Sequence, residues 1–277
     1  MPQWRLAAVV GLTLALAGGG AVAQKAPAGI GGVAGVALAP HVALYDLSLG
    51  SAKTGSGVTR LRGKLAIEVN DLCDGFAVSQ RIRMDVASND GDEVTTDFSL
   101  SGWEGRDGLR YRFSLTNDTG GRRVEEYLGQ AQLTGRGKGG RATLERPPGM
   151  KVELPPGTIF PTEHLALVVS RAKAGDTIVA AKVFDGAGDD GLYDVNGVVT
   201  KAPAAEAKGP LTAIKGQRAW RVRLAYFPIA KPTDRPEYEV GFRLFENGIS
   251  DQLLIDYGDF AMKGELVRLE LSPKPDC

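Results

Sequence analysis

The stretch GKLAIEVNDLCDGFAVSQRIRMDV, residues 63–86, decides the fold class of this chain. In both of its halves apolar residues alternate with polar ones, as in a β-strand with one buried face and one wet face. Between the halves stands Asp74-Gly75, a dipeptide that favours a tight hairpin turn. The stretch therefore predicts two antiparallel strands joined by a hairpin, with Cys73 beside the turn.

The same alternation recurs along the chain. Its apolar positions include Tyr111, Phe113 and Leu115, then Trp220, Val222, Leu224 and Tyr226, then Tyr238, Val240, Phe242 and Leu244, and finally Val267, Leu269 and Leu271. Turn signals separate the runs at 89–91, 107–108, 117–121 and 247–248. This spacing predicts a mainly β protein, an antiparallel meander of about a dozen strands.

One segment, residues 161–175, follows a helical pattern instead. Pro161 stands at the start, Glu163 in the first turn, Lys173 in the last turn and Gly175 after it. These are the start and stop signals of an α-helix. The apolar positions that we expect to pack on the sheet are Leu165, Val168, Val169 and Ala172.

The N-terminus has the organisation of an export signal. Arg5 supplies a positive charge, residues 6–17 are apolar, and Ala21-Val22-Ala23 is a small-residue cleavage pattern. We expect residues 1–23 to be removed, leaving a soluble exported protein; an uncleaved anchor is the alternative, although three glycines at 18–20 interrupt the apolar run. Residues 24–40 are rich in Gly and Ala and predict a flexible leader. Residues 41–277 predict a single β-rich domain.

The chain has two cysteines, Cys73 and Cys277. In an oxidising compartment an even number of cysteines favours pairing, which here allows one intramolecular disulfide. Such a bond would place the last strand beside the first hairpin and tie the ends of a wrapped sheet, which leaves fewer unpaired backbone groups. A free Cys277 with a buried Cys73, or a bond between chains, stays open as an alternative.

Charge and motifs exclude several classes of protein. Lys and Arg number 33, as do Asp and Glu, so no net charge attracts nucleic acid or anionic lipid. The two histidines, His41 and His164, are too few for a histidine-rich metal site. We find no G-x-S-x-G and no H-E-x-x-H motif, and we expect no cofactor, no metal and no catalytic residue.

Two loops resemble ligand sites only in composition. The acidic segment 185–194 lacks the spacing of a calcium-binding EF-hand, and we expect a solvated turn there. The segment 134–140, TGRGKGG, lacks the ending of a phosphate-binding P-loop and predicts a hairpin turn.

The aromatic residues allow two interpretations, a packed core or the lining of a hollow that holds a lipid or a peptidoglycan fragment. They are Trp103, Tyr111, Phe113, Trp220, Tyr226, Phe227, Tyr238, Phe242 and Phe245. The sequence favours the packed core, and it does not identify the residues that would bind a ligand.

Several segments together resemble the EipB family of cell-envelope-integrity proteins of α-proteobacteria. They are HVALYDLSL (41–49), GKLAIEVNDLCDGFAVSQR (63–81), DFSLSGWEGRDGLRYRF (97–113), FPTEH (160–164), FDGAGDDGLYDV (184–195) and the terminal cysteine. The resemblance implies a periplasmic protein with a long spiralling antiparallel sheet, barrel-like and open, and an internal disulfide, which Cys73 and Cys277 match by position. It also implies a role in envelope integrity under stress, but no reaction.

We therefore expect a non-enzymatic periplasmic protein, a monomer, that maintains envelope integrity by binding periplasmic proteins or cell-wall and lipid components. A periplasmic carrier or sensor of an apolar, lipid-like ligand is the alternative, and an enzyme is a third class. Lipid that co-purifies with the protein would distinguish the carrier from the other two.

Overall fold

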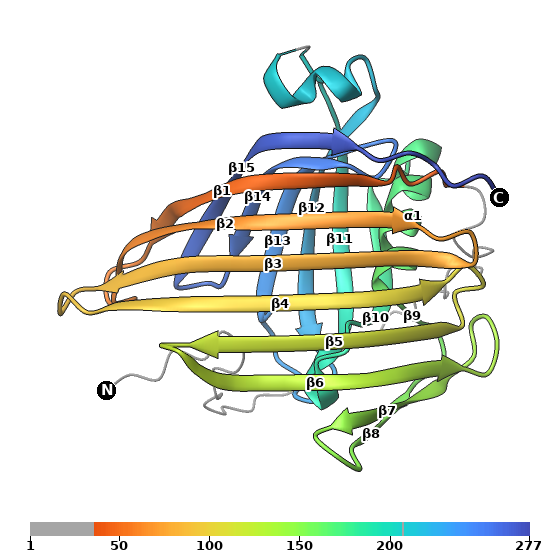
Figure 1. Ribbon diagram of the computed structural model, residues 1–277, viewed down its shortest axis with the longest axis horizontal. Helices are drawn as coiled ribbons and strands as arrows, with labels where there is room; N and C mark the ends of the chain where they lie inside the picture. Colours follow the sequence, from red (N-terminus) through yellow and green to blue (C-terminus); the bar gives the residue numbers. More distant parts are fainter. Residues whose placement is uncertain (1–35, 207) are drawn as a thin grey trace, which may run out of the picture.

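The computed structural model describes residues 36–206 and 208–277, and its strands form one sheet of fifteen (Figure 1). In chain order the strands are β1 (His41–Ala52), β2 (Val58–Asp71), β3 (Gly75–Ser88), β4 (Glu93–Gly105), β5 (Arg110–Thr119), β6 (Arg122–Leu133), β7 (Gly140–Arg146), β8 (Lys151–Leu154), β9 (Thr158–Ile159), β10 (Ile178–Phe184), β11 (Leu192–Ala202), β12 (Ala219–Pro228), β13 (Tyr238–Phe245), β14 (Ser250–Asp256) and β15 (Phe260–Leu271). The predicted signal peptide, 1–23, and residues 24–35 of the predicted leader lie outside the described residues.

The sheet is continuous because its first and last strands pair with each other. Strands β1 to β8 form one antiparallel meander and β10 to β15 form another. Antiparallel pairing of β1 with β15, from His41 opposite Leu271 to Ala52 opposite Phe260, joins the two. This confirms the predicted long, curved, antiparallel and barrel-like open sheet. The last strand pairs with β1, which separates it from the β2–β3 hairpin that holds Cys73.

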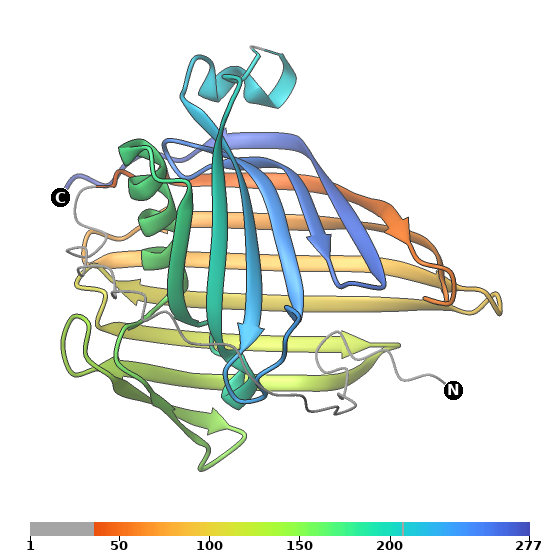
Figure 2. The ribbon, with the colours of Figure 1, turned by 180° about the vertical axis from the view of Figure 1, so that it is seen from behind.

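The continuous sheet folds into two facing walls. Strands β1 to β8 run side by side in the front wall, and β10 to β13 cross behind them at a steep angle (Figures 1 and 2). Alternate residues of each wall point into the space between the walls, which is why the sequence alternates with a period of two.

The two edges of the sheet, β8 and β9, are neighbours in sequence. Only Pro155-Pro156-Gly157 separates them, and β9 pairs in parallel with β10. The first and last strands of the chain, β1 and β15, instead lie next to each other in the middle of the sheet. Our expectation that a bond between the cysteines ties the ends of the sheet is therefore wrong, because those ends lie in the middle of the chain.

The predicted helix is present as α1 (Pro161–Ala174), the one α-helix of the described residues. It ends at Gly175, whose φ of 89° needs a residue without a β-carbon and whose N–H donates to the carbonyl of Ala172. The helix stands at one end of the walls, beside β10 (Figure 2). Val168 and Val169 are buried against the inward side chains of β10 to β13, as expected.

Inward side chains from both walls form the core. Those that are almost completely buried and largest in volume include Tyr45, Phe160, Phe184, Phe245, Leu61 and Ile214. Burial of one such apolar side chain stabilises the fold by about 1.5–3 kcal/mol. Two short 3-10 helices, η1 (Gly188–Gly191) and η2 (Gly209–Ile214), complete the described elements.

The structure differs from two expectations about where elements begin and how many there are. Sequence predicts about a dozen strands, but fifteen are present because β8 and β9 are too short, at 4 and 2 residues, to show an alternating pattern. The flexible leader was expected to reach residue 40. Leu38, however, is 4% exposed and packs on Phe76, and the N–H of Ala39 donates to the carbonyl of Asn247, so the packed chain begins before β1.

Candidate functional site

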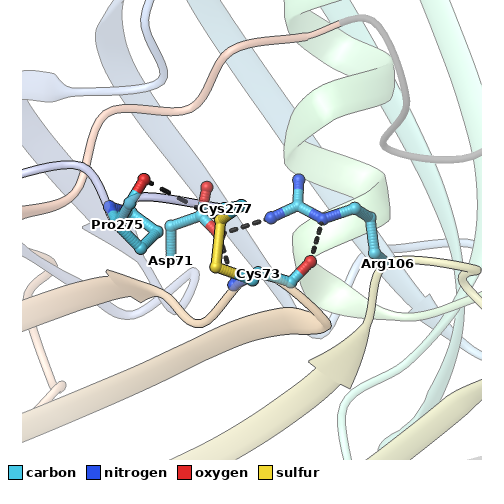
Figure 3. The surroundings of a disulfide bond; sticks show 5 residues. All are labelled: Asp71, Cys73, Arg106, Pro275 and Cys277. Atoms are coloured by element: carbon cyan, nitrogen blue, oxygen red, sulfur yellow. Dashed lines mark hydrogen bonds and ion pairs between the residues drawn. A yellow bond between two sulfur atoms is a disulfide. The ribbon is translucent and has the colours of Figure 1, made fainter.

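The two cysteines meet where the β2–β3 hairpin touches the C-terminal tail (Figure 3). A disulfide joins Cys73 to Cys277, with 5.8 Å between their α-carbons and a separation of 204 residues in sequence. Both residues are exposed at the surface. The bond therefore fastens the tail that follows β15 to a hairpin of the front wall.

Hydrogen bonds hold Cys73 in the conformation that the bond requires. Its φ of 65° lies in the left-handed region, which is uncommon for a residue with a β-carbon. The N–H of Cys73 donates to Oδ1 of Asp71 at 3.0 Å, and Nε of Arg106 donates to the Cys73 carbonyl at 2.7 Å. Arg106 and Asp71 also form an ion pair, so the end of β2 and the β4–β5 turn together hold the backbone at Cys73 (Figure 3).

Glu104 on β4 caps the start of α1 from outside the helix. Its Oε2 accepts the N–H of Thr162 at 2.7 Å and its Oε1 accepts the N–H of Glu163 at 2.8 Å. No carbonyl within the helix accepts a hydrogen bond from these N–H groups, and the N-cap residue, Phe160, has no side-chain acceptor to offer them. Burial raises the pKa of Glu104 to about 8, against the lowering effect of the two N–H donors.

Sequence reasoning missed Glu104, although a signal was present. Tyr111, its partner on β5, points inward, so Glu104 occupies an inward position where the alternation calls for an apolar residue. A buried carboxyl group is costly unless hydrogen-bond donors satisfy it, and the first N–H groups of a helix are donors without a partner in the helix.

The two histidines lie in separate, buried surroundings. His41 opens β1, and its Nδ1 lies 2.7 Å from the carbonyl of Ala39. His164 is in the first turn of α1 and is 5% exposed. Burial lowers the pKa of His41, and it lowers the pKa of His164 to about 4. Both side chains are thus held neutral at neutral pH and serve as packing groups.

The acidic loop 185–194 is packed, and the expectation of a solvated turn is wrong. Gly186 and Gly188 have positive φ and lie against the rings of Phe113 and Tyr127, where a β-carbon would clash. The hydroxyl of Tyr111 donates to the carbonyl of Asp185. Burial raises the pKa of Asp185 to about 7, although the N–H of Ala187 donates to its Oδ1. The glycines let the loop approach the front wall closely, so it closes one side of the barrel.

The second glycine-rich loop, 134–140, is the hairpin turn that sequence predicts. It connects β6 to β7, and the N–H and the hydroxyl of Thr134 both donate to the carbonyl of Gly139. Among residues 36–206 and 208–277, no group of three His, Cys, Asp or Glu residues is arranged to hold a metal ion.

The nine aromatic residues divide between core and partly exposed positions. Tyr111, Phe113, Trp220 and Phe245 are buried, as the core interpretation requires. Tyr226 and Tyr238 stack at 4.5 Å on adjacent strands, and Tyr193 meets both edge-on. The remaining residues, Trp103, Phe227 and Phe242, are half-buried.

Trp103 belongs to the outer face of the front wall and not to the interior. Its indole lies over Gly75 and Gly105, where the missing β-carbons leave room for the ring. Arg110 and Arg112 place their guanidinium groups 5.3 Å from the ring centre. The prediction that groups Trp103 with the inward aromatics is therefore wrong. Successive residues of a strand point to opposite faces, and its neighbour Glu104 is the residue that points inward.

Several inward apolar residues in the middle of both walls keep part of their surface accessible. On the front wall these are Ile82, Phe98 and Leu100, and on the back wall Val240 and Phe242 are also half-buried. Phe98 and Leu100 belong to none of the four packed clusters. The facing sides of both walls therefore keep some apolar surface accessible to solvent.

These observations define a class: an antiparallel, barrel-like protein whose C-terminal tail is fastened to a hairpin by a disulfide. The chain belongs to the EipB-like family, whose model matches residues 33–273. It is 32% identical over 256 residues to the cell envelope integrity protein EipB of Brucella abortus (strain 2308), covering 88% of this chain and 89% of that protein.

The fold has a solved counterpart. The crystal structure of a β-barrel-like protein of domain of unknown function DUF1849 from Brucella abortus matches with a TM-score of 0.78 and 31% sequence identity. The match covers 86% of this chain and 100% of that one. Within the part of this chain that the structure describes, no helix has the length and apolar character needed to span a bilayer.

Proposed function

We propose that this is a periplasmic protein that maintains the integrity of the cell envelope under stress, and that it acts by binding envelope proteins or cell-wall material. The observation that carries the proposal is the family membership, together with 32% identity over most of both chains to a protein named for envelope integrity. The export signal predicted at residues 1–23 supports the compartment.

A binding role also agrees with the chemistry of the titratable groups. The two histidines are buried and neutral, and Glu104 is engaged by the start of α1. General acid–base catalysis needs such groups within reach of a substrate proton. These groups instead hold the helix and the first strand in place, so they serve the scaffold.

Deletion of the gene tests the role. We expect the deletion strain to become sensitive to detergent and to antibiotics that act on the cell wall, while its growth in unstressed medium stays near that of the parent. Equal survival of the two strains under every envelope stress would contradict the proposal.

The carriage of an apolar ligand is a second candidate, and the accessible apolar surface between the walls favours it. Phe98, Leu100 and Phe242 offer this space an apolar lining, which is the usual character of a small-molecule site. Mass spectrometry of lipid extracted from protein purified from the periplasm would detect such a ligand.

A matched pair of variants separates this candidate from adventitious lipid. Leu100 points between the walls and its neighbour Ser101 points outward, since Leu100 pairs with Gln80 and Leu115 and Ser101 with Ser79 and Ser114. We expect Leu100→Trp to lower the amount of lipid per protein and Ser101→Trp to leave it unchanged. Equal lipid content in both variants would exclude the carrier role.

A further inference from the structure

The sheet is incomplete at one place, where β15 separates from β14. Residues 261–264 of β15 pair with β14 on one side and with β1 on the other. Residues 265–271, except Val267 at a register shift, pair with β1 alone. Figure 2 shows the two strands close together at their hairpin and apart toward their other ends. The sheet therefore contains a fork, with one edge of β15 open.

The geometry of β14 causes the fork. Gln252 has a φ of 54°, and the register between β13 and β14 shifts at this point, so the strand bulges between Asp251 and Leu253. On the near side of the bulge the hydroxyl of Tyr45 donates to the carbonyl of Ser250 at 2.7 Å. This bond satisfies a β14 carbonyl that has no ladder partner on β15, and so stabilises the separation.

The open edge of β15 carries unused hydrogen-bonding groups. Among the described residues, only the backbone of β1 is bonded to the backbone of residues 265–271. An unpaired strand edge is a template for another strand, and proteins usually cover or block such edges. Here η2 stands over the edge and covers it in part (Figure 1).

A groove of about 810 Å³ remains at the fork. Its apolar lining includes Pro210 and Leu211 of η2 and Leu253 and Leu254 of β14. The buried ion pair of Arg243 and Asp251 also lines it. Lys263 and Glu265 also line the groove; both are exposed, and neither has an ion-pair partner among the described residues.

We propose that this groove binds an extended peptide segment of a partner protein, which adds a strand to the open edge of β15. The backbone of the peptide would bond to residues 265–271, as in other cases of recognition by strand addition. Apolar side chains of the peptide would alternate into the space between Leu211 and Leu253. A base opposite Glu265 would complete the pairing, because opposite charges across a ladder attract, and Lys263, at the closed end of the fork, would attract an acid at the end of the peptide.

The overhang of η2 favours a single strand over a second copy of this chain. A folded copy would bring a whole sheet edge with neighbouring strands on it, and η2 rises above β15 where those strands would lie (Figure 1). A lone extended segment needs only the width of one strand, about 4.8 Å.

This inference rests on the proposed function and deepens it, since it gives the binding of partners a surface. The test uses the full mature chain and random dodecapeptides displayed on phage, with selected peptides then made synthetically. Ser48 lies on β1 opposite Lys263 and lines the groove, so Ser48→Trp would fill it. Thr200→Trp, at an exposed position of β11 outside the groove, is the matched control.

We expect selected peptides to lose affinity by about tenfold or more for Ser48→Trp and to keep it for Thr200→Trp. Two versions of each peptide would carry N-methyl groups on alternate amides, one on the odd and one on the even positions. Only one version should bind, because one of these two sets of amides donates hydrogen bonds to β15. Amide hydrogen exchange at 265–271 should slow when peptide binds. If selection yields no peptide, or if binding is indifferent to Ser48→Trp and to N-methylation, the proposal is overturned, while the stress phenotype of the deletion strain stands independently.

Discussion

Substitution of Glu104 tests how the front wall holds α1. Glutamine keeps one oxygen but turns an amide toward the second N–H, so one buried donor loses its acceptor. An unsatisfied buried donor costs about 1–3 kcal/mol, and we expect Glu104→Gln to lower the free energy of unfolding by that amount. Glu104→Ala leaves both donors unsatisfied and a space behind, so we expect a loss of about 3–5 kcal/mol.

The pH dependence provides a second readout of the same carboxyl. Its pKa is about 8 in the folded protein, above the usual value of 4.5 that applies to the unfolded chain. Between these values the folded state holds a proton that the unfolded state has lost. The contribution of Glu104 to stability is therefore complete below about 4.5 and is lost as the pH rises to about 8.

Urea denaturation of the wild type and of Glu104→Gln at several pH values measures both effects. His41 and His164 titrate in both proteins, so the difference between the two curves isolates Glu104. Glu163→Gln, in the first turn of the same helix, is the control; it weakens an ion pair with Arg136 and should change stability by less than about 1 kcal/mol. If Glu104→Gln unfolds like the wild type with the same pH slope, the capping argument is refuted.

Three further predictions concern the disulfide, the buried ion pair and metals. Thiol labelling of the denatured, unreduced protein should find no free sulfhydryl, and Cys73→Ser should lose up to about 5 kcal/mol in urea denaturation, the loop-closure value for 204 residues; a full complement of labelled thiols would remove the bond. Arg243→Met should lower the free energy of unfolding by about 3–5 kcal/mol in urea denaturation, because Asp251 is left as a buried, unpaired charge. The double variant Arg243→Met with Asp251→Leu should recover most of this loss. Equal stability of the single and double variants would show that the pair is not coupled. EDTA should leave the thermal melting point unchanged, and a fall on chelation would indicate a bound cation.

The sequence predicts the local structure well because each local signal has one physical meaning. Alternation in residues 63–86 requires a sheet face, Asp74-Gly75 a hairpin, and Pro161 with Gly175 a helix start and stop. The expected cysteine bond brought the last strand near the hairpin that holds Cys73, but the pairing of β1 with β15 was not predicted, since no local pattern specifies which distant strands meet.

Long-range features escaped prediction because they depend on that pairing. The role of Glu104 is not visible in the sequence, because the start of α1, which it caps, is 58 residues further along the chain. The fork between β14 and β15 depends on a positive φ at Gln252, a residue with no strong preference for turns. The acidic loop 185–194 appeared solvated because its partner rings, on β5 and β6, are more than 50 residues away in sequence.

The most direct test of the account is the rescue of a deletion strain under detergent stress. The strain would carry an empty plasmid, the full chain, or a chain that starts at Gln24 and so lacks the predicted export signal. We predict that only the full chain restores survival to the parental level, because the protein acts outside the cytoplasm. Full rescue by the chain that starts at Gln24, with that protein found only in the cytoplasm, would contradict the account.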